Sequence, residues 1–286
     1  MGHLESGTLC GLLERAVAHG HATGALVPLT TALKVIHEGP WRFPVRVLGN
    51  VNLKLNDPTT SAPAGENNPF LPHDPNLFVA GLSETHICLL NKYPIIPGHH
   101  LIVTRAFEAQ ETQLTLADFE ATWRCLAQVD GVAFYNSGQM AGASQPHKHM
   151  QLIPHPTDEE ALPNEALLRG ELLFRGARHV YARTQADFDA GFVRDLHERY
   201  QGLLAQLGLS PAPGQSKPKP YNLLLTREFM MVVPRIRECL GEMSLNAMAF
   251  MGSLFVRSEE QLEALQRFGL LNTLRYAAGG PEDKEA

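Results

Sequence analysis

Two pairs of strand-like runs constrain the fold of this chain more than any other feature of its sequence. The first pair covers His86 to Asn91 and His99 to Thr104, and the second covers Tyr221 to Thr226 and Phe229 to Pro234. Each pair is joined by a short segment with turn chemistry, which is typical of a hairpin whose strands run antiparallel. A parallel sheet would instead need a long crossover, usually a helix, in each connection. The chain is therefore predicted to have an α+β fold with an antiparallel sheet.

Periodicity predicts the remaining elements. We expect helices over residues 8–19, 116–129, 188–207 and 258–268, where apolar residues recur every three or four positions. We expect further strands over residues 43–55, 132–136, 147–153 and 247–256, and loops over residues 56–68 and 210–220. Because a hairpin, a helix and a strand occur in both halves, the pattern indicates a diverged duplication. Residues 1–160 would form an N-terminal part and residues 161–286 a C-terminal part of one compact unit.

Composition limits the classes of protein to which the chain can belong. Of its 286 residues 44% are hydrophobic, which suffices for a sizeable core, yet no apolar run approaches the roughly 20 residues that a bilayer span requires. The formal charge of −6 argues against a broad nucleic-acid surface but allows a pocket in which a few cations bind a small anion. The four cysteines form no CxxC pair. We therefore expect a cytoplasmic protein with neither nucleic acid nor a membrane as partner.

The segment from His147 to Gln151 contains the strongest candidate for a reactive site. Side chains on a strand alternate between faces, so His147, His149 and Gln151 are expected on one face, and Lys148 and Met150 on the other. The preceding loop is rich in small residues, whose backbone N–H groups can approach an anion closely. Its four candidate residues are Gly142, Ala143, Ser144 and Gln145.

Spacing alone leaves three interpretations of the two histidines open. An imidazole can attack phosphorus and form a phosphoramidate, provided that an acceptor holds its second nitrogen. Two histidines can also hold a metal ion together with a third ligand. The candidates for that ligand are His73, His86, His99, His100 and His155. Finally, the pair can be an ordinary feature of a solvated strand face.

The stretch Gly142 to Gln151 resembles the active-site segment of the ATP adenylyltransferases, also called diadenosine tetraphosphate phosphorylases. This family is the branch of the histidine-triad superfamily in which glutamine replaces the third histidine. Further segments match in the same order, at residues 68–72, 90–97, 221–228, 233–235 and 246–248. The resemblance spans roughly residues 40 to 260, and it implies a histidine-triad-like antiparallel sheet with flanking helices.

The resemblance implies that His149 is the nucleophile, with His147 and Gln151 completing the catalytic motif. It also implies substrate contacts from Lys54, Asn91, Lys92, Asn136, Gly142, Ala143, Ser144, Gln145, Asn222, Thr226 and Met230. Two positions depart from the family pattern. Ala143 stands where a serine is common, which removes a hydroxyl but spares the backbone donors. Pro146 replaces an acidic residue of eukaryotic relatives, which leaves the hydrogen bonding around His147 open.

The implied reaction cleaves diadenosine tetraphosphate with phosphate to give ATP and ADP through an adenylyl-histidine, with Mg²⁺ carried on the substrate phosphates. Three alternatives are a hexose-1-phosphate uridylyltransferase-like enzyme, a dinucleoside polyphosphate hydrolase and a non-catalytic nucleotide sensor. The first usually has His-Pro-His and zinc-binding cysteines, and this sequence has neither. Lys217 and Lys219 lie in the loop over residues 210–220 and are either solvated or close over an anionic substrate. The sequence predicts no oligomeric state.

Overall fold

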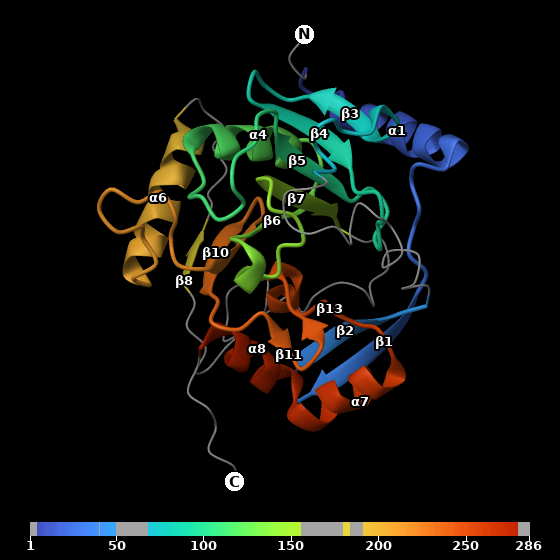
Figure 1. Cartoon of the computed structure of the whole chain (residues 1–286), viewed down its shortest axis with the longest axis vertical. Coiled ribbons are helices and arrows are strands. Elements are labelled where there is room, and N and C mark those ends of the chain that lie inside the picture. Colours follow the sequence, from blue (N-terminus) through green and yellow to red (C-terminus); the bar gives the residue numbers. More distant parts are fainter. Residues whose placement is uncertain (1–4, 40, 50–67, 156–179, 184–190, 280–286) are drawn as a thin grey trace.

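An eight-stranded sheet forms the centre of the protein (Figure 1), as described in a computed structural model that covers residues 5–39, 41–49, 68–155, 180–183 and 191–279. All neighbouring strands in this sheet are antiparallel. In spatial order they are β3 (Phe78–Gly81), β4 (His86–Leu90), β5 (His100–Thr104), β7 (His149–Pro154), β6 (Gly131–Asn136), β9 (Tyr221–Leu225), β10 (Phe229–Pro234) and β8 (Val180–Arg183). The predicted α+β class is confirmed, and so are both hairpins, β4–β5 and β9–β10.

The order of the strands is mirrored about the junction between β6 and β9. On one side the order is β6, β7, β5, and on the other it is β9, β10, β8. The two halves also share the order of elements along the chain: a strand, a helix and then an antiparallel pair of strands. These elements are β5, α4, β6 and β7 in the first half, and β8, α6, β9 and β10 in the second. This arrangement is what a diverged duplication produces, and it joins both parts of the chain in one sheet.

In the described part of the chain, one face of the sheet is covered by the helices α1 (Leu9–Thr23), α4 (Leu116–Leu126) and α6 (Phe192–Gln206). They lie close to the predicted ranges. Thr115 begins α4 with a capping box, because its hydroxyl accepts from the Asp118 N–H while the Asp118 carboxylate accepts from the Thr115 N–H. Alternate side chains of β10, such as Met230 and Val232, pack under these helices. None of the helices in the described part of the chain is long and apolar enough to cross a membrane.

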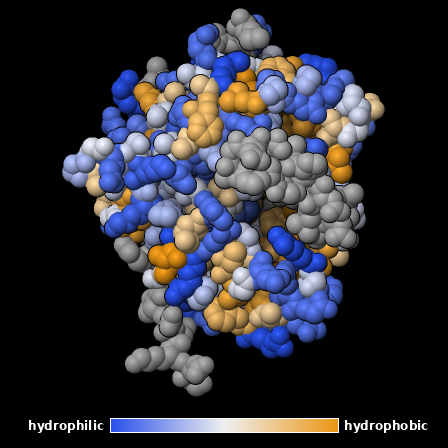
Figure 2. Space-filling model, in the orientation of Figure 1, coloured by the Kyte–Doolittle hydropathy of each residue, from blue (hydrophilic) through white to orange (hydrophobic). Residues whose placement is uncertain are grey.

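A second layer packs against the other face of the large sheet. It contains the sheet β1 (Thr31–Glu38), β2 (Trp41–Leu48) and β13 (Leu254–Val256), the ribbon β11 (Cys239–Leu240) and β12 (Met243–Ser244), the 3₁₀ helix η4 (Ala247–Met251), and the helices α7 (Glu259–Phe268) and α8 (Leu270–Ala278). Two shorter 3₁₀ turns, η1 (Pro75–Leu77) and η2 (Gln139–Ala141), lie in loops. Hydrophilic and hydrophobic residues are intermixed over the coloured part of the surface in Figure 2.

Some predicted elements differ from the structure. The strand expected over residues 43–55 is β2, which ends at Leu48, and residues 50–67, with most of the expected loop, lie outside the described part of the chain. The strand expected over residues 247–256 is wrong in its first half, which forms η4. That half is a continuous apolar run, in which periodicity cannot distinguish strand from helix. The side chain of Asn246 accepts from the Met248 N–H and starts the turn, and Gly252, with a φ of 81°, ends it.

Candidate active site

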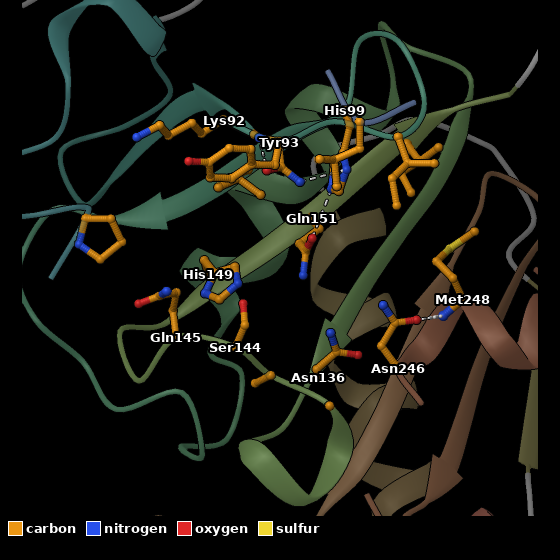
Figure 3. Close-up of a pocket in the computed structure, with 18 of the residues that line it drawn as sticks. Lys92, Tyr93, His99, Asn136, Ser144, Gln145, His149, Gln151, Asn246 and Met248 are labelled. Carbon is orange, nitrogen blue, oxygen red and sulfur yellow. Dashed lines mark hydrogen bonds between the residues drawn. The ribbon is translucent and has the colours of Figure 1, made fainter. Parts of the chain in front are cut away.

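A cavity of about 930 Å³ lies where the large sheet meets the second layer. The end of β6, strand β7 and the loop over residues 142–145 form one wall (Figure 3). Asn246, Met248 and Arg257 from the C-terminal part also line it. Both parts of the chain therefore contribute to one site.

The alternation predicted along the catalytic strand holds from Lys148 to Gln151, but not for His147. His149 and Gln151 line the cavity, whereas Lys148 and Met150 lie on the opposite face of the sheet. The Lys148 side chain is 1% exposed and its ammonium forms an ion pair with Asp118 at 2.7 Å, and Met150 packs in the core beneath α4. Because a one-residue shift would exchange the two faces, the buried ion pair and the core packing both fix the register that presents His149 to the cavity.

The His149 ring is held in a form that suits a nucleophile. Its Nδ1–H donates to the backbone carbonyl of His147 at 2.8 Å, and no described residue is hydrogen-bonded to Nε2. The side chain is nearly buried, with Phe70 at 5.3 Å between ring centroids. Burial lowers the pKa of His149 to about 4, so the ring is neutral at physiological pH. The lone pair therefore resides on Nε2.

His147 is engaged through both ring nitrogens. The Asn68 amide donates to His147 Nδ1 at 2.9 Å, and its orientation is fixed because its oxygen accepts from the Phe70 N–H at 3.0 Å. The Nε2–H of His147 then donates to the Thr104 carbonyl at 2.8 Å. With neither nitrogen available, the interpretation of His147 and His149 as a metal-binding pair loses one of its ligands.

His147 also differs from its predicted position. The strand β7 begins at His149, and His147 forms an isolated bridge to Ala109 instead. It is absent from the described residues that line the cavity, and its carbonyl rather than its ring acts on His149. Pro146 does not disturb this arrangement, because Asn68 and Thr104 supply the hydrogen bonds to His147.

Gln110, which the sequence analysis did not single out, fastens the backbone of His149. The pairing between β6 and β7 stops at Phe134 and Gln151. Beyond that point the Gln110 side chain lies between the strands: its oxygen accepts from the His149 N–H at 2.8 Å, and its nitrogen donates to the carbonyls of Asn136 at 2.9 Å and His149 at 3.1 Å. Gln110 lies 39 positions before His149 in the sequence, and no local pattern marks it.

Three side-chain amides point their NH₂ groups into the cavity: those of Gln151, Asn136 and Asn246 (Figure 3). In each of them the oxygen is already occupied. Gln151 Oε1 accepts from His99 Nε2 at 2.9 Å, Asn136 Oδ1 accepts from Asn222 Nδ2 at 2.8 Å and from the Ala247 N–H at 2.9 Å, and Asn246 Oδ1 accepts from the Met248 N–H at 3.0 Å. Each amide is therefore oriented as a donor, and donors fixed in this way can stabilise phosphoryl oxygens.

The loop over residues 142–145 lines the cavity as predicted, but only part of its backbone is available. Gly142 has a φ of 87°, and a Cβ there would lie 2.4 Å from the Leu245 carbonyl oxygen, so the position requires glycine. The N–H groups of Gly142 and Ala143 donate within the turn, to Gln139 and Gly138. The N–H groups of Ser144 and Gln145 have no partner among the described residues and are the donors left for an anion.

The other predicted contact residues fall into three groups. Asn91 and Lys92 line the cavity, with the Lys92 ammonium 5.4 Å from the centre of the Tyr93 ring. Lys54 lies outside the described part of the chain. Asn222, Thr226 and Met230 are buried and do not line the cavity in the described structure.

These three residues have structural partners instead. Asn222 donates to Asn136 and to the Ala141 carbonyl, and thereby supports the cavity wall from behind. The Thr226 hydroxyl accepts from the Phe229 N–H in the turn between β9 and β10, and Met230 faces the helices on the other side of the sheet. Sequence position alone could not show which side of this hairpin faces the cavity.

The cavity wall contains no cluster of metal ligands among the described residues. Among all described residues, the one group that could offer three ligand atoms is Cys88, His100 and Cys125, which is buried between the sheet and α4, on the face away from His149. Lys217 forms an ion pair with Glu111 at 2.8 Å and does not belong to the described lining. Arg257, which was not predicted to be a site residue, also lines the cavity and adds a second cation to it, in addition to Lys92.

Comparison with known proteins identifies similar families and folds. The family model of the Ap4A phosphorylase N-terminal domain matches residues 2–170, and that of the ATP adenylyltransferase C-terminal domain matches residues 177–278. Diadenosine 5',5'''-P1,P4-tetraphosphate phosphorylase 2 of Saccharomyces cerevisiae is 29% identical over 214 residues, which are 62% of this chain and 64% of that protein. Protein APA1 of the same organism is 28% identical over 220 residues, 68% of each chain.

Solved structures agree with these matches at the level of the fold. Yeast Ap4A phosphorylase Apa2 in complex with Ap4A superposes with a TM-score of 0.78 and 23% identity, covering 97% of this chain and 99% of the other. The complex of the same yeast protein with AMP gives the same TM-score and identity, and covers 98% of this chain and all of the other. The large antiparallel sheet with flanking helices is thus part of a fold that this chain shares with the yeast protein.

Proposed function

This chain belongs to the Ap4A phosphorylase family, and from that premise we propose that it cleaves diadenosine tetraphosphate with inorganic phosphate to give ATP and ADP. The observation that supports the proposal most strongly is the state of His149. Its Nδ1–H is held by the His147 carbonyl, its Nε2 is unprotonated, and it stands beside amide donors whose oxygens are all occupied. A nucleophile and a group of preorganised donors within one cavity are what attack on a phosphoryl group requires.

In the first step, the Nε2 lone pair of His149 attacks the α-phosphorus. The bond from that phosphorus to the bridging oxygen breaks, and the oxygen leaves with the bonding electrons as part of ATP. The ring becomes an adenylyl-imidazolium, whose Nδ1–H remains donated to the His147 carbonyl. That hydrogen bond strengthens as positive charge develops on the ring, because charged donors form stronger hydrogen bonds than neutral ones.

In the second step, an oxygen of inorganic phosphate attacks the same phosphorus. The phosphorus–nitrogen bond breaks, the electron pair returns to Nε2, and ADP is released. Two displacements at one phosphorus make the scheme ping-pong. The amide groups of Gln151, Asn136 and Asn246 and the N–H groups of Ser144 and Gln145 would donate to the non-bridging oxygens in both steps.

The polyphosphate chain would lie near Lys92 and Arg257, which supply positive charge to the cavity wall of a protein that is itself net negative. We propose that Mg²⁺ arrives bound to the phosphates of the substrate. The lining of the described cavity supports this proposal, since its polar groups are mainly amides, imidazoles and backbone N–H groups rather than a cluster of carboxylates that could hold the ion.

Product analysis tests the proposal against its alternatives. Diadenosine tetraphosphate should yield ADP and ATP only when phosphate is present. AMP and ATP without added phosphate would indicate a hydrolase instead, and transfer of a uridylyl group from a UDP-sugar would indicate a uridylyltransferase. Binding of the substrate without turnover or covalent labelling would indicate a nucleotide sensor.

A further inference from the structure

We propose that His99 is a positioning residue, which sets the orientation of the Gln151 amide so that its NH₂ group, and not its oxygen, faces the reacting phosphoryl group. His99 acts through Gln151 and needs no contact with the substrate. The inference rests on the proposed function, because it concerns the donor that Gln151 would offer in the reaction.

The orientation of Gln151 can be traced to a backbone group that has only one hydrogen-bonding role. The N–H of Tyr93 can only donate, and the oxygen of the Asn91 side chain accepts from it at 3.1 Å. The amide nitrogen of Asn91 therefore faces His99 Nδ1, to which it donates at 3.0 Å. A ring that accepts at Nδ1 carries its proton on Nε2, and this N–H donates to the Gln151 oxygen at 2.9 Å.

Every hydrogen bond in this series has a fixed direction, and the last one leaves the Gln151 NH₂ group, on the side of His149, without a partner among the described residues (Figure 3). A glutamine amide can otherwise rotate by half a turn at little steric cost, since its nitrogen and oxygen have nearly the same size. The rotated amide would present an oxygen lone pair to a phosphoryl oxygen that is gaining negative charge. His99 disfavours that rotamer, because its Nε2–H would then face an NH₂ group.

The same arrangement occurs a second time in the site, which shows how the fold controls its imidazoles. A backbone N–H, that of Phe70, fixes the Asn68 amide, and this amide donates to His147 Nδ1. The Nε2–H of His147 then donates to the Thr104 carbonyl. In both cases an asparagine sets the tautomer of a histidine. The His147 series ends on a backbone carbonyl, whereas the His99 series ends on a side chain that lines the cavity.

The surroundings of His99 suit a fixed ring. It begins the approach to β5, its own N–H donates to the Ile96 carbonyl, and its side chain packs against Phe134 at 6.1 Å between ring centroids. Only 9% of the residue is exposed. A residue held in this way can hold its neighbour with little loss of entropy during the reaction.

A double-mutant cycle tests the inference. Truncation of one transition-state donor typically lowers kcat about 10²- to 10³-fold, so we expect Gln151→Ala to show a loss of that size. His99→Ala should lower kcat by about 10-fold or more with little change in KM, because the amide then samples both rotamers. In the Gln151→Ala background, His99→Ala should cause no further loss, since its only route of action is gone. An equal loss in both backgrounds would overturn the inference.

Two substitutions at the same position separate the hydrogen bond from packing. His99→Gln can place an amide N–H where the Nε2–H of the ring lies and should restore most of kcat. His99→Asn is one methylene shorter, its amide falls nearer the position of Nδ1, and it should behave like alanine. Equal activity of the two variants would contradict a role through the Nε2 donor. Thermal unfolding of each variant checks that it is folded.

An observation independent of turnover completes the test. Imidazole ¹⁵N shifts of the free protein should show His99 protonated on Nε2, and a proton on Nδ1 would overturn the inference whatever the activity. If the wild-type protein showed the expected tautomer but failed to cleave diadenosine tetraphosphate with phosphate, the proposed function would fail, and the catalytic role of His99 with it. Cleavage by the wild-type protein with no effect of His99→Ala would refute only the role of His99.

Discussion

Gln110 offers the sharpest test of how the fold positions the nucleophile. Its side chain makes three hydrogen bonds to backbone groups, two of them on His149 and one on Asn136, and it is 2% exposed. Gln110→Ala leaves all three groups without that partner. A buried polar group without a partner costs about 1–3 kcal/mol, and water can enter the space that the truncated side chain leaves. We therefore expect the free energy of unfolding to fall by about 3 kcal/mol.

The loss should also reach catalysis, because the same hydrogen bonds hold the backbone of His149. A displacement of about 1 Å at a reacting group can cost about 10²-fold in rate, and we expect a fall in kcat of that order. Chemical denaturation followed by circular dichroism measures the first effect, and steady-state kinetics with diadenosine tetraphosphate measures the second. Gln110→Glu keeps the volume and the acceptor for the His149 N–H but removes both donors, so it separates hydrogen bonding from packing.

Gln113→Ala is the matched control, because Gln113 lies in the same loop and forms hydrogen bonds to the described part of the chain only through its own backbone N–H and carbonyl groups, which the substitution keeps. It should leave stability within about 0.5 kcal/mol of the wild-type protein, as is usual for such substitutions. If Gln110→Ala had no larger effect than Gln113→Ala on either measurement, the reasoning that Gln110 fastens His149 would be refuted.

Two further predictions concern His149 and Lys92. Burial lowers the pKa of His149 to about 4 in the folded protein, against about 6.5 in the unfolded chain. Acid therefore favours unfolding through this group: its contribution to stability is present above pH 6.5 and is lost as the pH falls towards 4, by up to about 1.4 kcal/mol per pH unit. Denaturation curves at several pH values should lose that slope in His149→Gln, and an unchanged slope would contradict burial of a neutral ring. Lys92→Ala should raise KM with little change in kcat if the ammonium contacts the phosphates equally in the ground and transition states. A fall in kcat would instead mean that the ammonium stabilises the leaving polyphosphate. Unchanged KM and kcat would exclude any contact between Lys92 and the substrate.

The sequence predicts those parts of the molecule that depend on local patterns. The hairpins β4–β5 and β9–β10 follow from strand-like runs with short turns. Alternation along residues 148–151 correctly assigns His149 and Gln151 to one face and Lys148 to the other. Each of these inferences needs only neighbouring residues and a known period.

The parts that could not be predicted depend on contacts between distant segments. Gln110 reaches His149 across 39 positions, and His99 reaches Gln151 across 52. Periodicity states which residues share a face but not which element covers that face, so Thr226 and Met230 were expected at the substrate although they are buried elsewhere. The capping role of Asn246 could have been predicted, since an asparagine before an apolar run indicates a helical cap.

In the proposed reaction His149 forms a covalent adenylyl intermediate, and direct detection of that intermediate tests the mechanism. The protein would be mixed with diadenosine tetraphosphate and Mg²⁺ without phosphate, quenched at alkaline pH to preserve the phosphorus–nitrogen bond, digested and examined by mass spectrometry. We expect one AMP group on the peptide that contains His149, with release of ATP, and its conversion to ADP when phosphate is added before the quench. An AMP group on another residue, or full turnover by His149→Ala, would contradict the mechanism.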